Sequence, residues 1–353
     1  MKILILIKSM LHGGAERQAV VDACALHKRG HKVTIAYHKE GPLSALLDKG
    51  IELYRIKYKN IFAASCRLTW KLMRDKYDTV FAHMFWAEKA AAVPAALTGH
   101  KLILVEHGLG LWRKWYHILV MKFAAALAHR VLCVCEATRG VRLQREKLRP
   151  GKLQVIYNSF QIAGEPGIEI VPDQARDYFT IGFVGRFAEI KRIGTFVEIA
   201  KRLKKRIKAF KIILVGDGEE NERIKEEIKR NALDEYFLLT GFALSPSRYY
   251  RSFDIFVLPS KREAFPIVLL EAGAWGIPCL AFDVGGNSEI IRDGKTGFIL
   301  PDYYIGQMVE RIMMLYEKPA KRKEMGIAAE KFVKERFSIE KRLLSLEKLI
   351  KEI

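Results

Sequence analysis

The chain has 353 residues, of which half are hydrophobic, so it is long enough to bury the cores of two domains of ordinary size. Its 60 Lys and Arg residues outnumber its 40 Asp and Glu residues, which gives a formal net charge of +20. The best candidate for a membrane span, residues 117–135, is interrupted by basic residues, and the apolar start of the chain is interrupted by Lys8. These features exclude a membrane-spanning helix and a secretion signal, and they predict that the chain starts with a buried strand.

The amino-terminal half alternates short apolar strands with helical segments, a pattern typical of a parallel sheet with right-handed crossovers. The predicted strands in this half are residues 3–7, 33–37, 52–56, 79–82, 102–105, 131–134 and 154–156. Two glycines and two prolines lie between residues 161 and 177, and no clear period runs through them. We therefore expect a first domain at residues 1–165 and a linker at residues 166–178.

The alternating pattern restarts after the linker. The predicted strands there are residues 180–184, 211–215, 237–239, 255–258, 279–282 and 298–300. They predict a second domain at residues 179–336 with its own parallel sheet, so the expected fold class is α/β with two Rossmann-like domains. Ligands of such sheets bind outside the carboxyl ends of the strands, and two facing domains would form one cleft there.

Positive charge is concentrated in residues 1–160, which contain 27 Lys and Arg residues against 11 Asp and Glu residues. In the predicted helix at residues 61–76, the basic residues Arg67, Lys71 and Arg74 are spaced to share one face, with apolar residues on another. The spacing predicts a basic amphipathic helix.

Residues 112–130 combine several aromatic residues with lysine and arginine, a composition suited to a lipid interface. Arg142, Arg145 and Arg149 form a further basic row. We expect these segments to contact an anionic membrane surface, whereas no recognised motif supports nucleic-acid binding. The alternative is that these rows are ordinary solvated faces of surface helices.

The chain has five cysteines, an odd number, and the Cys133–Cys135 spacing fits neither a redox motif nor a zinc site. We expect all five to be reduced and to fill the core of a cytosolic protein.

The first predicted strand is followed by the sequence KSMLHGGAE, in which Gly13 and Gly14 precede a predicted helix. Glycines let a ligand approach the backbone closely, and the N–H groups at a helix start favour anions. The segment lacks both the dinucleotide fingerprint and the Lys-Ser or Lys-Thr pair of a phosphate loop. A dehydrogenase and a P-loop enzyme are therefore disfavoured.

Two histidines follow predicted strands of the first half. His107 comes after residues 102–105 and is followed by Gly108, which gives the backbone freedom to present it. His83 follows the predicted strand at residues 79–82 in the same way and is a candidate for contact with a substrate. Active-site side chains collect at such strand ends, although a structural histidine is the alternative.

Arg186 and Lys191 follow the first strand of the second half, five residues apart. Two cations there could offset the negative charge that grows on a nucleotide leaving group, although solvated surface cations are the alternative. Asp217 lies between two glycines and is predicted to be a turn residue. No Asp-x-Asp triad or His/Cys cluster supports a divalent ion, so no metal is expected.

The segment from residue 260 to 289, SKREAFPIVLLEAGAWGIPCLAFDVGGNSE, places Glu263 on a loop and Glu271 on a helix that Pro266 can start. The unpaired N–H groups of that helix start could hold a diphosphate. The two carboxylates are better suited to sugar and ribose hydroxyls, because they would repel phosphate. Together with the turn at Gly285 and Gly286, they predict a sugar-nucleotide pocket.

These residues also resemble a known family. The segment from Glu263 to Glu289 is similar to the carboxyl-terminal signature of the family 4 glycosyltransferases, which are retaining enzymes of the GT-B fold and include bacterial cell-surface polysaccharide and lipopolysaccharide glycosyltransferases. The segments VGRFAEIK (184–191), VGDG (215–218) and TGF (240–242) match further landmarks in the same order. Departures are Pro266, where many members have glycine, and the sequence NSFQ at 158–161, which puts the role of Asn158 in doubt.

The resemblance implies a GT-B fold whose last helix, at residues 337–353, crosses back to the first domain. It implies no metal and no cofactor. The implied catalytic residues are Arg186, Lys191, His107 and Glu263. The implied contacts to the nucleotide sugar are Gly13, Gly14, Gly241, Phe242, Ala264, Phe265, Pro266, Ile267 and Glu271, with Glu16 a further candidate.

We therefore expect a retaining glycosyltransferase that moves a hexosyl or N-acetylhexosaminyl group from a nucleotide-diphosphate sugar, UDP favoured over GDP, to a lipid-linked or anionic glycan acceptor. Such an enzyme would be cytoplasmic and peripheral on the inner face of the cytoplasmic membrane. Two alternatives are a non-hydrolysing nucleotide-sugar 2-epimerase and a membrane-surface binding protein without catalysis. The joint presence of Glu263, Glu271, Arg186 and Lys191 argues against the binding protein.

Overall fold

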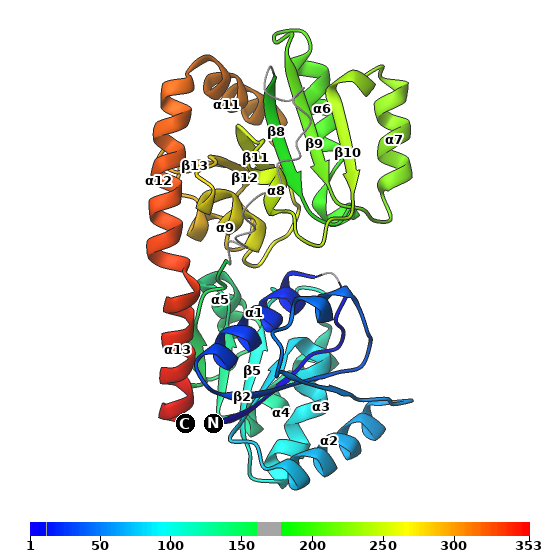
Figure 1. Cartoon of the computed structure of the whole chain (residues 1–353), viewed down its shortest axis with the longest axis vertical. Helices are drawn as coiled ribbons and strands as arrows, with labels where there is room; N and C mark the ends of the chain where they lie inside the picture. Colours follow the sequence, from blue (N-terminus) through cyan, green and yellow to red (C-terminus); the bar gives the residue numbers. More distant parts are fainter. Residues whose placement is uncertain (12, 161–177) are drawn as a thin grey trace. The chain divides into compact units, whose positions relative to one another are not determined.

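A computed structural model describes residues 1–11, 13–160 and 178–353, which form two compact units (Figure 1). The N-terminal unit comprises Met1–Ser159 together with Ile339–Ile353, and the C-terminal unit comprises Phe160–Ser338. The predicted boundary at residue 165 and the linker at residues 166–178, apart from its last residue, lie outside the described residues. Each unit is described by itself.

The N-terminal unit is built on a parallel sheet with the strand order β3-β2-β1-β4-β5-β6-β7. Its strands are β1 (Lys2–Leu6), β2 (Lys32–Tyr37), β3 (Glu52–Arg55), β4 (Thr79–His83), β5 (Lys101–Glu106), β6 (Arg130–Cys133) and β7 (Leu153–Val155). The central strands are buried along nearly their whole length, because helices cover both faces of such a sheet. The seven strands predicted from the sequence are confirmed, with ends that differ by no more than one residue.

Helices connect these strands and cover the sheet. They are α1 (Gly14–Lys28), α2 (Ile61–Asp75), α3 (Met84–Leu97), α4 (Trp115–Leu127) and α5 (Glu136–Gln144). Helices α2, α3 and α4 pack side by side in that order. None of the helices in the described ranges has both the length and the apolar character needed to cross a bilayer.

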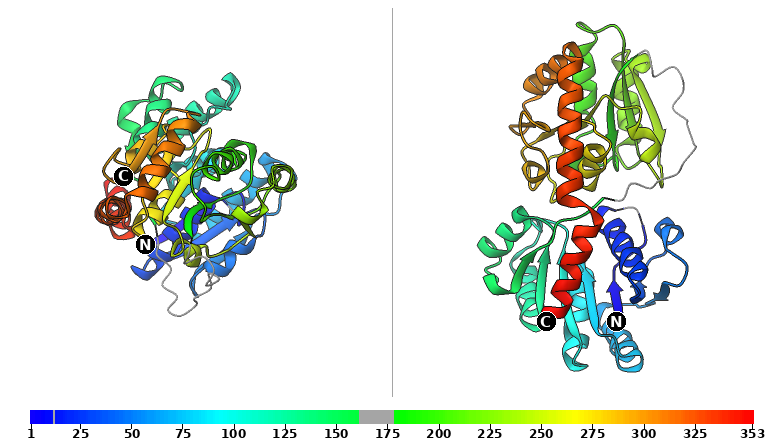
Figure 2. Two further views of the ribbon diagram at one scale, coloured as in Figure 1. Left: turned by 90° about the horizontal axis from the view of Figure 1, so that it is seen from above. Right: turned by 60° about the vertical axis from the view of Figure 1, so that its left-hand side comes forward.

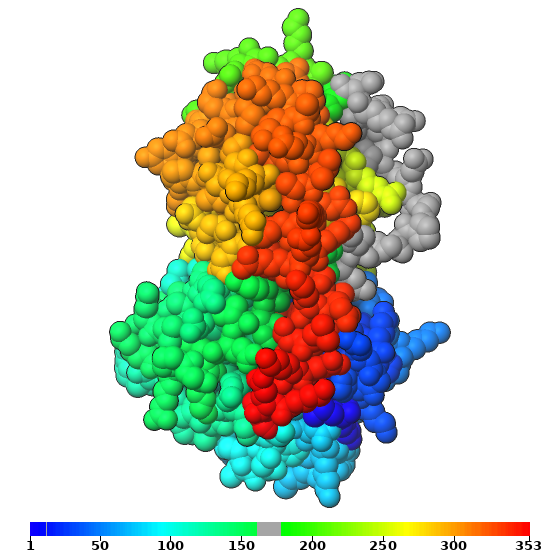
Figure 3. Space-filling model, turned by 90° about the vertical axis from the view of Figure 1, so that its left-hand side faces the viewer, coloured from blue at the N-terminus to red at the C-terminus, as the bar shows by residue number. Residues whose placement is uncertain are grey.

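The carboxyl-terminal helix α13 (Ile339–Glu352) belongs to the N-terminal unit and packs against α1 (Figure 3). Arg342 is buried there and donates from Nε and Nη2 to the two carboxylate oxygens of Asp22, both at 2.7 Å. It also donates to the carbonyl oxygens of Ile156 and Tyr157. The bidentate contact fixes α13 to α1, and the two carbonyl contacts fix it to the chain segment that follows β7.

The C-terminal unit has a second parallel sheet, with the order β10-β9-β8-β11-β12-β13. Its strands are β8 (Phe179–Val184), β9 (Phe210–Val215), β10 (Phe237–Gly241), β11 (Ile255–Leu258), β12 (Cys279–Phe282) and β13 (Gly297–Leu300). Its helices are α6 (Thr195–Leu203), α7 (Asn221–Arg230), α8 (Ser247–Tyr250), α9 (Ile267–Ala274), α10 (Asn287–Ile290), α11 (Ile305–Glu317) and α12 (Pro319–Phe337). Helix α12 runs along one side of this unit and packs on α9 (Figure 2). The prediction of two parallel-sheet domains is thus confirmed.

The structure corrects the predicted basic face of α2. Lys71 has no exposed surface and forms ion pairs of 2.6 Å with Glu52 and with Asp75. Burial alone would lower the pKa of Lys71, but the hydrogen bonds to these carboxylates raise it above its usual value. The row through Arg67, Lys71 and Arg74 is therefore not a single solvent-facing basic stripe.

Two other predictions about which side chains are exposed also need correction. In the row Arg142, Arg145 and Arg149, Arg142 is fully buried. The prediction that all five cysteines fill the core is wrong for Cys66, which is exposed on α2, whereas the other four are buried.

Candidate active site

The loops after β8 and β11 meet in the C-terminal unit and join a cation to a carboxylate. Lys191 Nζ lies 2.6 Å from Glu263 Oε1, and both side chains are mostly buried. The backbone N–H of Lys261 donates to the carbonyl of Ile190 at 2.8 Å, which holds the two loops together. Two of the predicted catalytic residues are therefore in contact before any ligand binds.

Helix α9 begins immediately after this loop. Pro266 is its N-cap and Ile267 its first residue, so the helix starts one residue later than predicted. The first N–H groups of a helix lack partners within it, and they lie close in sequence to Ala264, Phe265 and Glu263. An anion site at this helix start stays a prediction from the sequence.

Glu271 lies one turn further along α9 and is buried. Its Oε2 accepts a hydrogen bond of 2.7 Å from the hydroxyl of Tyr250, at the end of α8. The sequence analysis missed Tyr250, because no periodicity links a residue of α8 to one of α9. The hydroxyl holds the carboxylate in one orientation, while a carboxylate retains further acceptor capacity.

The double-glycine turn clamps the backbone of this loop. Gly285 has φ = 59°, and a β-carbon there would collide with the carbonyl oxygen of Glu263. The N–H of Gly286 donates to the carbonyl of Ala264 at 2.8 Å. Glycine at 285 is therefore required for the position of Glu263.

The remaining predicted contacts of the C-terminal unit lie on neighbouring strand ends. The side chain of Arg186 is exposed and makes no ion pair or hydrogen bond with any residue in the described ranges, so the structure does not bring it into contact with Lys191. Gly241 ends β10, its carbonyl accepts from the N–H of Gly216, and Phe242 is 48% exposed. Asp217 Oδ1 accepts from the N–H of Gly218 at 2.8 Å, the geometry of a turn residue.

In the N-terminal unit, the Gly13–Gly14 segment begins α1, with Gly13 as the N-cap. Glu16 folds back over this start: its Oε1 accepts from Ser9 Oγ at 3.2 Å, and a β-carbon on Gly13 would collide with Oε2. The carboxylate takes the position beside the helix start that an anion would favour. Binding of a phosphate there would require Glu16 to turn away.

His83 and His107 form a pair at the ends of β4 and β5. His83 Nδ1 lies 2.9 Å from His107 Nε2, so one ring donates to the other. Burial lowers the pKa of His83 to about 4, and burial, His83 and Arg342 hold the pKa of His107 well below its usual value. Both rings are neutral near pH 7, and His107 Nδ1 has no partner among the described residues. In a neutral ring, such a nitrogen either donates one hydrogen bond to a hydroxyl or accepts one from it, depending on the tautomer.

The segment after His107 is fixed by buried charges. Arg113 Nη1 donates to Glu106 Oε1 at 2.7 Å and to Glu146 Oε1 at 3.0 Å. Arg142 contacts both of these carboxylates and donates to the carbonyl of Gly108 at 2.6 Å. Arg142 thus reaches the residue next to His107. This role could not be predicted from the sequence, because Arg142 has the spacing of a basic surface row with Arg145 and Arg149.

A third carboxyl, Glu88 on α3, completes this buried cluster. Burial and the neighbouring Glu106 raise the pKa of Glu88 well above its usual value, which favours the neutral acid although Glu88 Oε2 lies 3.6 Å from Arg113 Nη2. For Glu106, burial alone would raise the pKa, but Arg142 and Arg113 outweigh it and lower the pKa. Two arginines then face two carboxylates and one neutral acid, so the cluster is close to electroneutral.

The predicted site residues therefore fall into two groups, one in each unit. Lys191, Glu263 and the start of α9 form the group in the C-terminal unit, and His83 with His107 forms the group in the N-terminal unit.

Two family models match adjacent parts of the chain. The model described as Glycosyltransferase Family 4 matches residues 12–162, and the model described as Glycosyl transferases group 1 matches residues 169–332. The first covers most of the N-terminal unit, and the second covers Lys191, Glu263 and α9. Both groups of site residues thus lie in segments that these two models match.

Curated relatives carry glycosyltransferase names. The UDP-Gal:alpha-D-GlcNAc-diphosphoundecaprenol alpha-1,3-galactosyltransferase of Escherichia coli is 25% identical over 318 residues, which cover 82% of this chain and 81% of that protein. The poly(ribitol-phosphate) alpha-N-acetylglucosaminyltransferase of Staphylococcus aureus is 26% identical over 52% of this chain and 38% of its own length.

Solved structures show the same fold. HepE of Anabaena, in complex with UDP-glucose, has a TM-score of 0.88 at 20% identity, with all of both chains covered. TarM has a TM-score of 0.82 at 14% identity, with 99% of this chain and 98% of that chain covered. These neighbours are GT-B glycosyltransferases, which confirms the predicted fold class.

The histidine pair makes stability depend on pH. An unfolded histidine takes up a proton near pH 6.5, whereas folded His83 excludes it until about pH 4. Keeping His83 neutral therefore contributes about 3 kcal/mol to the free energy of unfolding above about pH 6.5. This contribution is lost as the pH falls from about 6.5 toward 4. Denaturant unfolding across this range should show a smaller loss in His83→Asn than in the wild type, with the remaining loss coming from His107, whose pKa burial also lowers. An equal loss in both proteins would contradict the assignment.

The buried cluster predicts that two isosteric substitutions lower the free energy of unfolding by very different amounts. Glu106→Gln leaves two arginines facing one carboxylate and should lower the free energy of unfolding by about 3–5 kcal/mol. Glu88→Gln replaces a neutral acid by a neutral amide and should change it by less than about 1 kcal/mol at neutral pH. Denaturant unfolding of both variants measures the difference, and similar losses would show that Glu88 is ionised.

Proposed function

Because the chain belongs to the family 4 and group 1 glycosyltransferases, we propose that it transfers a hexosyl or N-acetylhexosaminyl group from a UDP-sugar to a lipid-linked or anionic glycan acceptor, with retention of configuration, in cell-surface polysaccharide or lipopolysaccharide synthesis. The single observation that carries this proposal is the Lys191–Glu263 pair beside the start of α9. UDP is favoured because HepE is solved with UDP and UDP-glucose, and because the E. coli relative is named for UDP-Gal.

The donor is proposed to bind to the C-terminal unit. Its diphosphate lies at the start of α9, where backbone N–H groups and the positive end of the helix favour negative charge. Glu271, oriented by Tyr250, accepts a ribose hydroxyl, and Glu263 accepts a sugar hydroxyl while it holds Lys191. Phe242 and Gly241, at the end of β10, are placed beside the base.

The transfer breaks the bond between the anomeric carbon and the β-phosphate oxygen and forms a bond from the acceptor oxygen on the same face. The acceptor proton passes to the departing phosphate oxygen, so no external base is needed. Lys191 and Arg186 offset the charge that develops on the diphosphate, and no metal or other cofactor enters the proposal. Glu263 is engaged by Lys191, which argues against Glu263 as a covalent nucleophile.

The acceptor is proposed to bind to the N-terminal unit. His107 contacts a hydroxyl of the acceptor, with His83 fixing the ring. Because His107 Nδ1 is buried, the side chains around it must shift to admit the acceptor. Relatives named for undecaprenol-linked and poly(ribitol-phosphate) substrates support a lipid-linked or anionic acceptor. A protein that uses such acceptors would work on the cytoplasmic face of the membrane as a peripheral enzyme.

Nucleotide binding tests the donor pocket. UDP at about 100 times its dissociation constant should stabilise the wild type by about 2.7 kcal/mol, seen as a rise in melting temperature, and GDP and ADP should do so less. Glu271→Ala removes the ribose contact and should reduce the UDP shift. Tyr250→Phe is the matched control, since it removes only the hydroxyl that orients Glu271 and should retain most of the shift. No shift by any nucleotide in the wild type would contradict the proposal.

Lys191 is expected to act mainly in the transition state. Lys191→Ala should lower kcat by about 100-fold, because one donor to the leaving charge is lost, with a smaller effect on KM for the donor. Lys201→Ala, which removes a surface cation paired with Glu198, is the control and should leave kcat unchanged. Mass spectrometry of the enzyme with donor alone should find no sugar on any Glu or Asp, and a trapped glycosyl-enzyme would overturn the mechanism.

A further inference from the structure

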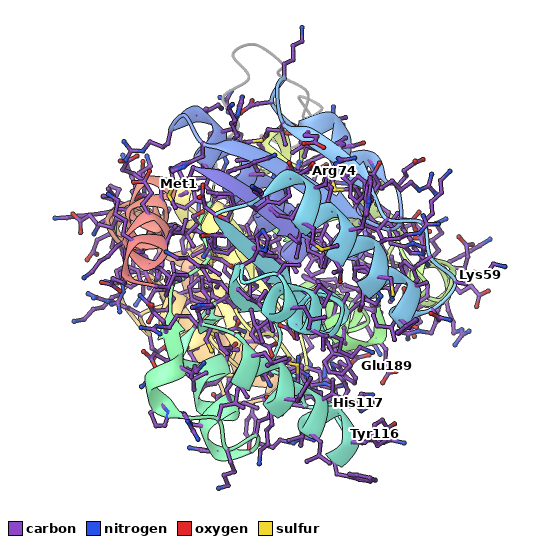
Figure 4. All side chains as sticks on the ribbon, turned by 90° about the horizontal axis from the view of Figure 1, so that it is seen from below. Met1, Lys59, Arg74, Tyr116, His117 and Glu189 are labelled. Atoms are coloured by element: carbon purple, nitrogen blue, oxygen red, sulfur yellow. The ribbon has the colours of Figure 1, made fainter. Side chains whose placement is uncertain are left out.

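The outer surface of α2, α3 and α4 is apolar to an unusual degree. Here "the α2–α4 face" means the exposed side chains Phe62, Trp70, Met73, Leu97, Trp115 and Phe123. Phe62, Leu97 and Trp115 are 75%, 74% and 72% exposed, one on each helix. Figure 4 shows these three helices side by side, with the labelled Tyr116 at the start of α4 projecting outward. Large apolar side chains that are exposed on neighbouring surface helices can mark an interaction site.

The same helices expose no unpaired carboxylate. Their acidic residues are Asp75 and Glu88. Asp75 is paired with both Lys71 and Arg74, and Glu88 is buried. Exposed cations on the same helices include Arg67 and Lys122. The α2–α4 face is therefore apolar and positively charged.

We propose that the α2–α4 face inserts shallowly into a bilayer that contains anionic phospholipids. Tryptophan and phenylalanine favour the boundary between headgroups and acyl chains, and the flanking cations match the negative headgroups. A second copy of this chain is disfavoured as the occupant, since two positively charged faces would repel each other. The insertion depends on exposed apolar side chains and not on a continuous basic stripe, because Lys71 lies inside the unit.

Trp115 of the α2–α4 face is close in sequence to the segment that carries His107. Trp112 and Trp115 flank Arg113, whose guanidinium is buried against Glu106, and Glu106 immediately precedes His107. A membrane contact at these tryptophans would hold the segment after β5 at the lipid surface. This inference extends the proposed lipid-linked acceptor but does not rest on catalysis.

Vesicle sedimentation tests the proposal. The full chain should bind vesicles of phosphatidylcholine with phosphatidylglycerol more tightly than vesicles of phosphatidylcholine alone. Trp115→Ser/Phe123→Ser should weaken binding by at least about 10-fold, since each ring would lose apolar burial. Tyr303→Ser/Tyr304→Ser removes two exposed aromatic residues of the C-terminal unit and should bind as the wild type does.

A second variant and a spectroscopic readout distinguish electrostatic attraction from insertion as contributions to vesicle binding. Arg67→Glu/Lys122→Glu should weaken binding to anionic vesicles and leave binding to neutral vesicles unchanged. A polarity-sensitive fluorophore on Cys66, the one exposed cysteine of the five, should shift to shorter wavelength on vesicles, as insertion of α2 requires. The UDP melting shift should persist in every variant, so loss of vesicle binding alone is distinguishable from failure of the proposed transferase.

Two results would overturn the proposal. One is vesicle binding that is equal in the wild type and Trp115→Ser/Phe123→Ser. The other is a wild-type dimer in solution that this variant converts to a monomer while neither protein binds vesicles, which would make a second copy the occupant.

Discussion

Two buried guanidinium groups, those of Arg113 and Arg142, fix the segment that carries His107 and the exposed tryptophans Trp112 and Trp115. Taking such charges out of water is costly, and only partners with good geometry offset the cost. Glu106 and Glu146 provide these partners. Because removal of one partner leaves a buried charge unpaired, the cluster holds together only as a whole. The cluster therefore holds the segment after β5 in a single arrangement.

The C-terminal unit positions its site by other means. There the close approach of backbone to backbone, at Gly285 and Glu263, sets the loop before α9, and one partly buried ion pair orients Lys191. Backbone packing of this kind holds the loop without using the carboxylate of Glu263, which binds Lys191 instead. The buried charge cluster of the N-terminal unit instead holds the backbone beside His107, whose Nδ1 has no hydrogen-bond partner among residues 1–11, 13–160 and 178–353. Both arrangements place polar groups at the carboxyl ends of parallel strands, where this class of sheet binds its ligands.

The strands of both sheets could be predicted from the sequence, because a strand buried on both faces is a short, continuous apolar run whatever its neighbours are. The direction of a charged side chain could not. Lys71 and Arg142 have the spacing of surface residues, but each reaches inward to carboxylates on other elements, and helical periodicity does not register such long-range partners. The Tyr250–Glu271 contact could not be predicted for the same reason, since it joins two helices whose sequences share no pattern. Local motifs identified the loops of the site, and only the fold identified what holds them.

These buried partners also change the meaning of the net charge. Part of the positive excess of the first half is internal, at Lys71, Arg113 and Arg142, and is neutralised by carboxylates. The cations that remain outside are spread around an apolar surface. Charges of this kind act over about 10 Å at moderate ionic strength, so they can draw the chain toward an anionic surface. Contact must then depend on the aromatic and aliphatic side chains, because apolar burial is not screened by salt. A membrane contact of this chain should therefore be more resistant to salt than its net charge alone suggests.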